Sequence, residues 1–128
     1  MIYPRITVKL QSGYGPVTYV GKQRITASPN GISYKNIPYM PSKLNPECSW
    51  WISIRSEKYT RLYSNLCKVL DRILAEEYWF IEDAGEAEFS VKTSDGKTIH
   101  KEISCGHDDV QKFFSTLKRM LPKDVTVL

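Results

Sequence analysis

The chain has 128 residues, of which 41% are hydrophobic and 25% are charged, values that fit one soluble domain spanning 1–128. No apolar run approaches the roughly 18 residues of a membrane span, and the opening MIYPRITVKL lacks the apolar region of a signal peptide. The three cysteines form no CxxC motif, which favours a reducing compartment over a disulfide scaffold. We therefore expect a cytoplasmic protein without a membrane partner.

Charge is distributed unevenly along the chain. Residues 1–46 contain six basic residues and no Asp or Glu, whereas residues 47–128 contain 12 basic and all 14 acidic residues. Six of the acids crowd residues 76–88. A solvated face whose counter-charges lie nearby in the fold is the simpler explanation, and attraction of an anionic partner is the alternative.

The first part of the chain predicts four strands, because apolar and polar residues alternate and turn residues separate the runs. Asn30-Gly31 is a strong signal for a hairpin between the second and third strands. Three prolines in residues 38–46 predict a loop before the fourth strand. The predicted strands are residues 5–10, 17–27, 31–37 and 48–54.

A long amphipathic helix is predicted next. Apolar residues recur with the helical period from Tyr59 to Leu74. Ser56 is the expected N-cap, and Glu57 complements the positive end of the helix. The polar face carries three cations that we treat as candidate binding residues: Arg61, Lys68 and Arg72.

A second hairpin and a second helix complete the prediction. Within residues 87–104, a three-residue loop Ser94-Asp95-Gly96 places Val91 opposite Ile99 and thereby collects the apolar residues on one face. The last helix has one apolar stripe, and DVTVL, residues 124–128, is expected to close the fold as a short strand. The stripe consists of Val110, Phe113, Phe114, Leu117, Met120 and Leu121.

These elements predict an α+β fold in which an antiparallel sheet of about six strands packs two helices on one face. A shift of 51 residues superimposes the apolar stripe of the first helix on that of the second. Each half can therefore be a β-hairpin followed by a helix, that is, a ββα-like unit. Any two strand–helix units share some of this pattern, so the duplication stays an open alternative.

The segment SCGHDDVQKFF, residues 104–114, gathers a cysteine, a histidine and two aspartates. We interpret it as the start of the second helix, with Cys105 as a small apolar residue and Asp108 with Gln111 as a capping box. A nucleophilic Cys–His pair would also need an orienting group and an oxyanion hole, and a structural zinc would need four ligands. We therefore predict no catalytic residue, no metal and no cofactor.

Trp50 and Trp51 are adjacent in the fourth strand and must point to opposite faces of the sheet. Trp50 shares its face with Ile52 and is expected in the core. We expect the loop at 38–47 to cover Trp51, with an exposed binding hot spot as the alternative.

Tyrosines interleave with basic residues in the N-terminal third, a pattern found on surfaces that bind single-stranded nucleic acid. Tyrosine is also a common strand residue, and no RNP, KH or helix-turn-helix signature is present. The candidate binding residues in this region are Lys22, Arg24, Lys35 and Trp51, and the tyrosines are Tyr3, Tyr14, Tyr19, Tyr34 and Tyr39.

Two segments, RITASPNGISYKNIPY at 24–39 and WWISIRSEKYTRLYSNL at 50–66, resemble a group of small proteins of Firmicutes. The shared features are a strand, a Pro-x-Gly-Ile-Ser-Tyr turn, a Trp-containing strand and a helix, and they cover about a third of the chain. The resemblance implies a bacterial, stand-alone domain. That group has no established activity to carry over.

The sequence thus favours a non-catalytic binding domain that acts on a protein partner. One specific version is an inhibitor carried by a mobile element against a nucleic-acid-processing defence enzyme, such as an anti-CRISPR-type protein. The alternative is nucleic-acid binding by the basic N-terminal sheet. The opposite charges of 1–46 and 76–88 also permit a homodimer.

Overall fold

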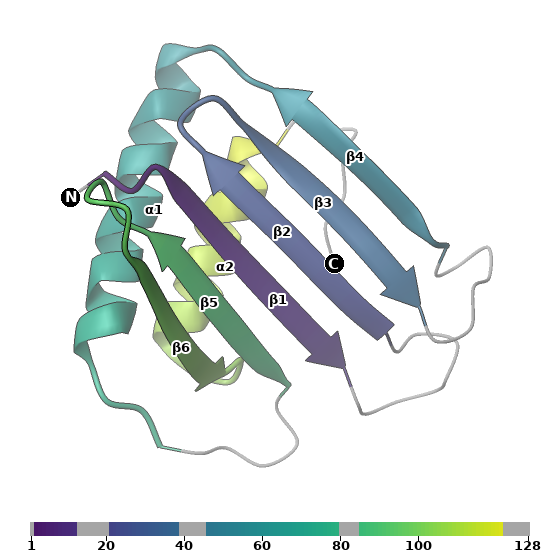
Figure 1. The fold of residues 1–128 in the computed structure, drawn as a ribbon, viewed down its shortest axis with the longest axis vertical. Coiled ribbons are helices and arrows are strands. Elements are labelled where there is room, and N and C mark those ends of the chain that lie inside the picture. The colour runs from purple at the N-terminus through teal and green to yellow at the C-terminus, as the bar shows by residue number, and fades with distance from the viewer. Residues whose placement is uncertain (1, 13–20, 39–45, 80–84, 122–128) are drawn as a thin grey trace.

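A computed structural model describes residues 2–12, 21–38, 46–79 and 85–121. Six strands form one antiparallel sheet in the order β4-β3-β2-β1-β5-β6, and both helices lie behind one face of it (Figure 1). The predicted α+β class is therefore confirmed. The elements are β1 Arg5–Ser12, β2 Gly21–Ser28, β3 Gly31–Pro38, β4 Cys48–Ser53, α1 Glu57–Ala75, β5 Glu86–Lys92, β6 Thr98–Ser104 and α2 Asp108–Met120.

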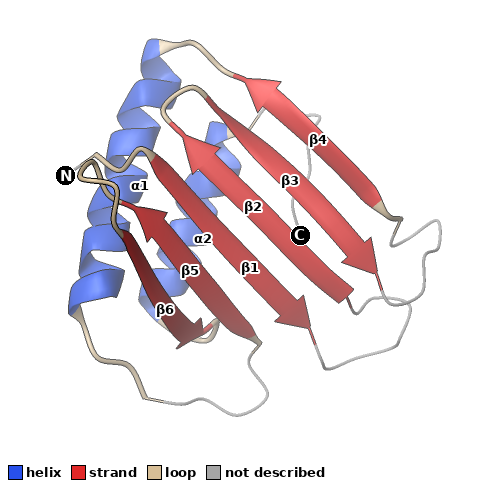
Figure 2. Ribbon diagram, viewed as in Figure 1, coloured by secondary structure: helices blue, strands red, loops and turns tan. Residues whose placement is uncertain are grey.

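The core fills the space between the sheet and the helices. Strand residues that face the helices are apolar and nearly inaccessible, as at Val8 with 1% exposure and Phe89 with 0%. The predicted stripes of both helices meet these residues in one shared cluster, which includes Leu66 of α1 and Leu117 of α2. Both helices therefore bury one stripe each against the same face, as the periodicity predicts. Among the described residues, no helix lies on the opposite face of the sheet (Figure 2).

Hydroxyl groups of buried tyrosines tie α1 to the sheet. The Tyr59 hydroxyl donates to the backbone carbonyls of Ser28 and Gly31, at 2.5 and 3.0 Å. The Tyr63 hydroxyl donates to the carbonyl of Tyr3 at 2.6 Å. Burying a phenol without a partner is costly, so these bonds both satisfy the hydroxyls and fix where α1 lies on the sheet.

The two hairpin turns differ in how closely they follow the predicted turns. Thr93 N–H donates to the Lys97 carbonyl at 2.9 Å, and Gly96 has φ of 87°, so the three-residue loop at 94–96 and its register are confirmed. The first turn consists of Pro29 and Asn30 instead of Asn30-Gly31.

Gly31 belongs to β3, where it pairs with Ser28 of β2 and Ser53 of β4. A Cβ at this position would lie 2.2 Å from the Ile52 carbonyl oxygen. The strand needs a glycine at this close approach between β3 and β4. The predicted hairpin and the start of its second strand at residue 31 are confirmed, and the turn pair lies one position before the Asn30-Gly31 signal.

The two edge strands each lead directly into a helix. β4 is one edge and precedes α1, and β6 is the other edge and precedes α2. The hairpin–helix units β3-β4-α1 and β5-β6-α2 therefore occupy opposite ends of the sheet, on either side of β2 and β1. The strand predicted at 124–128 and the first residues of the strand predicted at 17–27 lie outside the described residues.

Candidate binding surface on the open face of the sheet

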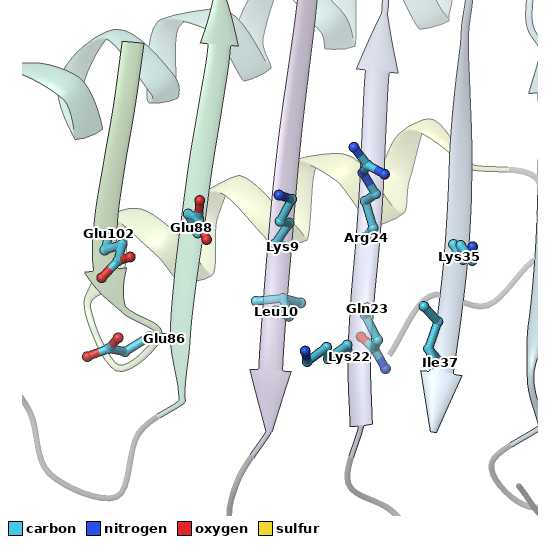
Figure 3. A pocket seen from close by; sticks show the side chains of 10 residues that line it. All are labelled: Lys9, Leu10, Lys22, Gln23, Arg24, Lys35, Ile37, Glu86, Glu88 and Glu102. Carbon is cyan, nitrogen blue, oxygen red and sulfur yellow. The ribbon is translucent and has the colours of Figure 1, made fainter. Parts of the chain in front are cut away.

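The open face of the sheet is built from every second residue of each strand. Lys9 of β1 pairs in register with Arg24 of β2 on one side and with Glu88 of β5 on the other. Continuing outward, Arg24 pairs with Lys35 of β3, and Glu88 pairs with Glu102 of β6. The strand registers thus place three cations and then two carboxylates in a single row across five strands, as Figure 3 shows.

This row lines a cleft of about 420 Å³. Lys22 and Ile37 border its basic side, and Glu86 borders its acidic side (Figure 3). Within the part of the chain that the structure describes, none of the five charged side chains of the row forms an ion pair or hydrogen bond. The face therefore carries cations on one side and carboxylates on the other, without an ion pair between the described side chains, and an incoming partner can complement both signs.

A second row of small polar residues runs beside the charged one. The registers align Trp51, Ser33, Thr26, Thr7, Ser90 and His100 across all six strands. Ser90 Oγ lies 2.9 Å from His100 Nδ1. The row ends in an aromatic side chain on β4 and an imidazole on β6, with hydroxyls between them.

Trp51 is 62% exposed, so the expectation that a loop covers it is wrong. It borders a hollow of about 410 Å³ whose lining includes Arg24, Lys35 and Ser49. Trp50, by contrast, packs against the core and lies 5.4 Å from Tyr34, ring to ring, as predicted. Pleating sends the two tryptophans to opposite faces, and both helices that the structure describes lie on the face of Trp50.

The structure divides the seven predicted binding residues among three places. Lys22, Arg24, Lys35 and Trp51 share the open face. Arg61 and Lys68 lie on the outer face of α1, beside a shallow groove near the β2–β3 turn. Arg72 stands where α1 ends, and its Nε lies 3.3 Å from the Asp109 carboxylate. Of the seven, the first four lie together on one face of the sheet.

The acidic half of the face was missed from the sequence. Glu88 and Glu102 become neighbours of the cations only because β1 pairs with β5, which lies more than 70 residues further along the chain. In the sequence, the one indication of an acidic neighbour is that residues 1–46 carry only basic charges whereas residues 76–88 are rich in acids.

Of the tyrosines predicted to interleave with the cations, the two that the structure describes are not available for stacking on the open face. Tyr3 and Tyr34 are buried, with 5% and 7% exposure, and the Tyr3 hydroxyl donates to Asp71 of α1. Tyr14, Tyr19 and Tyr39 lie outside the described residues. Burial raises the pKa of Tyr34, which fits a phenol enclosed on the covered side.

The segment 104–114 begins α2, as predicted, but its cap differs from the predicted one. His107 is the N-cap and makes no side-chain capping bond, so the Asp108–Gln111 capping box is wrong. The side-chain amide of Gln111 instead donates to the Cys105 carbonyl at 2.6 Å. The His107 ring is 6% exposed and does not cap the helix. Its Nε2 lies 2.7 Å from the backbone carbonyl of Trp79 instead.

The other side chains near this helix start make contacts within the fold. Burial raises the pKa of the Cys105 thiol, with the Glu86 carboxylate acting in the same direction, so little thiolate forms near neutral pH. The Tyr78 hydroxyl donates to Asp109 at 2.6 Å. Among the described residues, no group of three or more His, Cys, Asp or Glu side chains is arranged to hold a metal ion.

No protein-family model matches this chain, and no curated protein matches it at a significant level. Among the helices of the described residues, neither is long and apolar enough to cross a membrane.

Proposed function

We propose that this chain is a non-catalytic binding domain that recognises a protein partner through the open face of its sheet. The observation that supports the proposal is the in-register row of unneutralised cations and carboxylates, flanked by exposed Trp51. Tryptophan and arginine dominate the binding energy of protein interfaces, and complementary charges steer association. Trp51 and Arg24 border the same hollow.

A protein partner fits this face better than a nucleic acid does. A phosphate backbone following Lys35, Arg24 and Lys9 would meet Glu88 and Glu102 at the next two strands, at spacings of about 4.8 Å per strand. Single-stranded nucleic acid also needs several stacking aromatics, and Tyr3 and Tyr34 are buried. A protein surface can present both signs of charge in the required order.

The absence of a catalytic role is part of the proposal. The chemically reactive side chains near residue 105 are engaged in packing: the His107 ring contacts Tyr78 and Trp79, and the Cys105 thiol is held protonated. Cys48, Cys67 and Cys105 are all free, and none is paired with another. These contacts support a structural use of the segment.

Affinity capture from the native host, followed by quantitative mass spectrometry, tests the proposal. The wild-type chain, the Lys35→Glu/Trp51→Ala variant and an Arg61→Glu/Lys68→Glu control are used as parallel baits. We expect a specific protein that the wild type and the control retain and that the open-face variant loses. Equal recovery with all three baits would refute the open face as the binding surface.

Fluorescence anisotropy with a mixed-sequence single-stranded oligonucleotide tests the rival function. Phosphate contacts are strongest at low salt, so the titration is done at about 50 mM salt and repeated at higher salt. We expect no saturable binding. Low-micromolar binding that weakens steeply with salt would favour nucleic acid over a protein partner. In that case the logarithm of the affinity should fall against the logarithm of the salt concentration with a slope of about −0.7 per neutralised phosphate.

A further inference from the structure

The charge of the side chains in the central row changes sign at the boundary between β1 and β5. Lys9 and Arg24 lie on one side of it, on β1 and β2, and Glu88 and Glu102 lie on the other side, on β5 and β6. With strands about 4.8 Å apart, Arg24 and Glu102 are about 14 Å apart within one chain. Among the described residues neither has an ion-pair partner.

A two-fold axis makes this row complementary to itself. The axis runs parallel to the strands, in front of the open face, over the boundary between β1 and β5. The two-fold rotation about this axis leaves each residue at the same position along the strand direction. It brings the basic side of the row in one copy over the acidic side of the row in the other. Lys9 then faces Glu88 of a second copy, and Arg24 faces Glu102 of that copy.

We propose that two copies of this chain associate face to face through β1, β2, β5 and β6. The two-fold symmetry repeats each contact, so the row supplies four pairs of opposite charge. Stacked sheets lie about 10 Å apart, a gap that a Lys or Arg side chain and a Glu side chain span together. The inference rests on the proposed use of the open face and names a second copy as the occupant of its charged part.

The neighbouring row permits this approach. The same axis places Thr7 opposite Ser90 of the second copy and Thr26 opposite His100 of that copy. These side chains are short or polar, so within the described residues of this row no bulky aliphatic or indole group lies between the two sheets. At the end of the strands Arg5 faces Lys92 of the second copy, a like-charge contact. Because β-sheets twist, two stacked sheets diverge toward the ends of their strands, and this divergence moves Arg5 of one copy away from Lys92 of the other.

The dimer is weak and sensitive to salt. Lys and Glu are depleted at the centres of stable interfaces, and ion pairs exposed to water contribute little each. At physiological ionic strength charges are screened over about 8 Å, which is comparable to the separation of the sheets.

The association leaves part of the open face free. Under the same axis, β3 and β4 extend beyond the edge strand β6 of the second copy. Lys35 and Trp51 therefore stay accessible, and a separate protein partner can bind there while the dimer persists.

Charge exchange between Arg24 and Glu102 tests the dimer by sedimentation velocity over a range of concentrations. Because β1 and β5 separate the two residues within one chain, reversing one charge does not break a contact inside that chain. Arg24→Glu alone and Glu102→Arg alone each place two like-charge pairs across the axis. An equimolar mixture of the two variants, and the double variant Arg24→Glu/Glu102→Arg, both restore opposite charges.

At about 50 mM salt we expect the wild type to dimerise reversibly and each single variant to raise the dissociation constant about tenfold or more. The mixture and the double variant should recover most of the wild-type affinity. A wild type that stays monomeric, or single variants that dimerise as it does, or a mixture no tighter than its components, would overturn the dimer. Capture of a partner that depends on Lys35 and Trp51 would still stand, so failure of the dimer is distinguishable from failure of the proposed function.

Discussion

The two faces of the sheet are made by the same strands yet carry opposite chemistry. On β1 the inward Ile6 and Val8 are each 1% exposed, whereas Lys9, beside Val8, points outward to the charged row. The covered face is apolar and packs against two helices, and the open face is charged and carries none of the helices that the structure describes. Because pleating alternates the faces at each residue, stability and recognition are encoded at alternate positions. Substitutions can therefore separate the two.

The largest expected effect is on the covered face. Leu66 is 0% exposed, and Leu66→Ala removes buried methyl groups and leaves a cavity, which costs about 2–5 kcal/mol in the free energy of unfolding. Urea denaturation followed by circular dichroism measures the loss. Lys68→Ala, on the outer face of the same helix, is the control and should change stability by less than about 0.5 kcal/mol. A similar loss for both variants would contradict the assignment of faces.

The buried tyrosines predict a loss of stability at high pH. Burial raises the pKa of Tyr59 from its ordinary 10.0 to about 12, and burial also raises the pKa of Tyr63. The folded chain thus holds these phenols protonated where the unfolded chain ionises them. Their contribution is complete below about pH 10 and declines as the pH rises toward about 12.

Urea unfolding at a series of alkaline pH values measures this decline. Tyr59→Phe should make the decline shallower, because its ring cannot ionise. It should also lose stability at neutral pH, since the bonds to Ser28 and Gly31 disappear. Stability that is constant up to about pH 12 would show that the tyrosines are accessible in the folded chain.

A smaller effect is expected at the helix starts. Ser56 Oγ accepts from the Tyr59 N–H at 3.1 Å, so Ser56→Ala should cost about 1 kcal/mol, and Ser56→Thr should largely restore it. At the start of α2, His107 makes no such bond. His107→Gln keeps a donor for the Trp79 carbonyl and should change stability only modestly. Thermal unfolding of the three variants compares the two caps, and a greater loss for His107→Gln than for Ser56→Ala would reverse the ranking.

The smallest effect on stability, with the largest effect on binding, is expected on the open face. Lys22→Glu/Arg24→Glu should leave the free energy of unfolding within about 0.5 kcal/mol of the wild type, because both side chains are exposed. Association with the captured partner should slow about tenfold, since reversed charges oppose steering. Stopped-flow or surface-binding kinetics measure the rate. An unchanged rate would separate Lys22 and Arg24 from the binding surface.

Local patterns in the sequence predict most of the fold. Periodicity identifies both helices and their buried stripes, and apolar matching selects the register of the second hairpin. The predicted strand 31–37 includes Gly31, as β3 does, but the close approach of its backbone to Ile52 of β4 was not visible locally. The pairing of β1 with β5 is also non-local, and it alone places Lys9 beside Glu88.

The candidate site was therefore only half predictable. Lys22, Arg24, Lys35 and Trp51 could be proposed from residue type and strand position, whereas their acidic neighbours depended on the order of strands in the sheet. Trp51 was expected to be covered because a proline-rich loop precedes its strand. Trp51 is exposed on the face where the described residues form no helix, and sequence periodicity does not determine which face of the sheet the helices cover.

Two exposed tryptophans allow the central claim, that recognition occurs on the open face, to be tested by one measurement. Trp51 lies on that face and is 62% exposed, while Trp79 lies near the start of α2 and is 72% exposed. Hydroxyl-radical footprinting read by mass spectrometry reports the oxidation of both rings, with and without the captured partner. The account predicts that the partner protects Trp51 and leaves Trp79 unchanged. Protection of Trp79 with undiminished oxidation of Trp51 would contradict it.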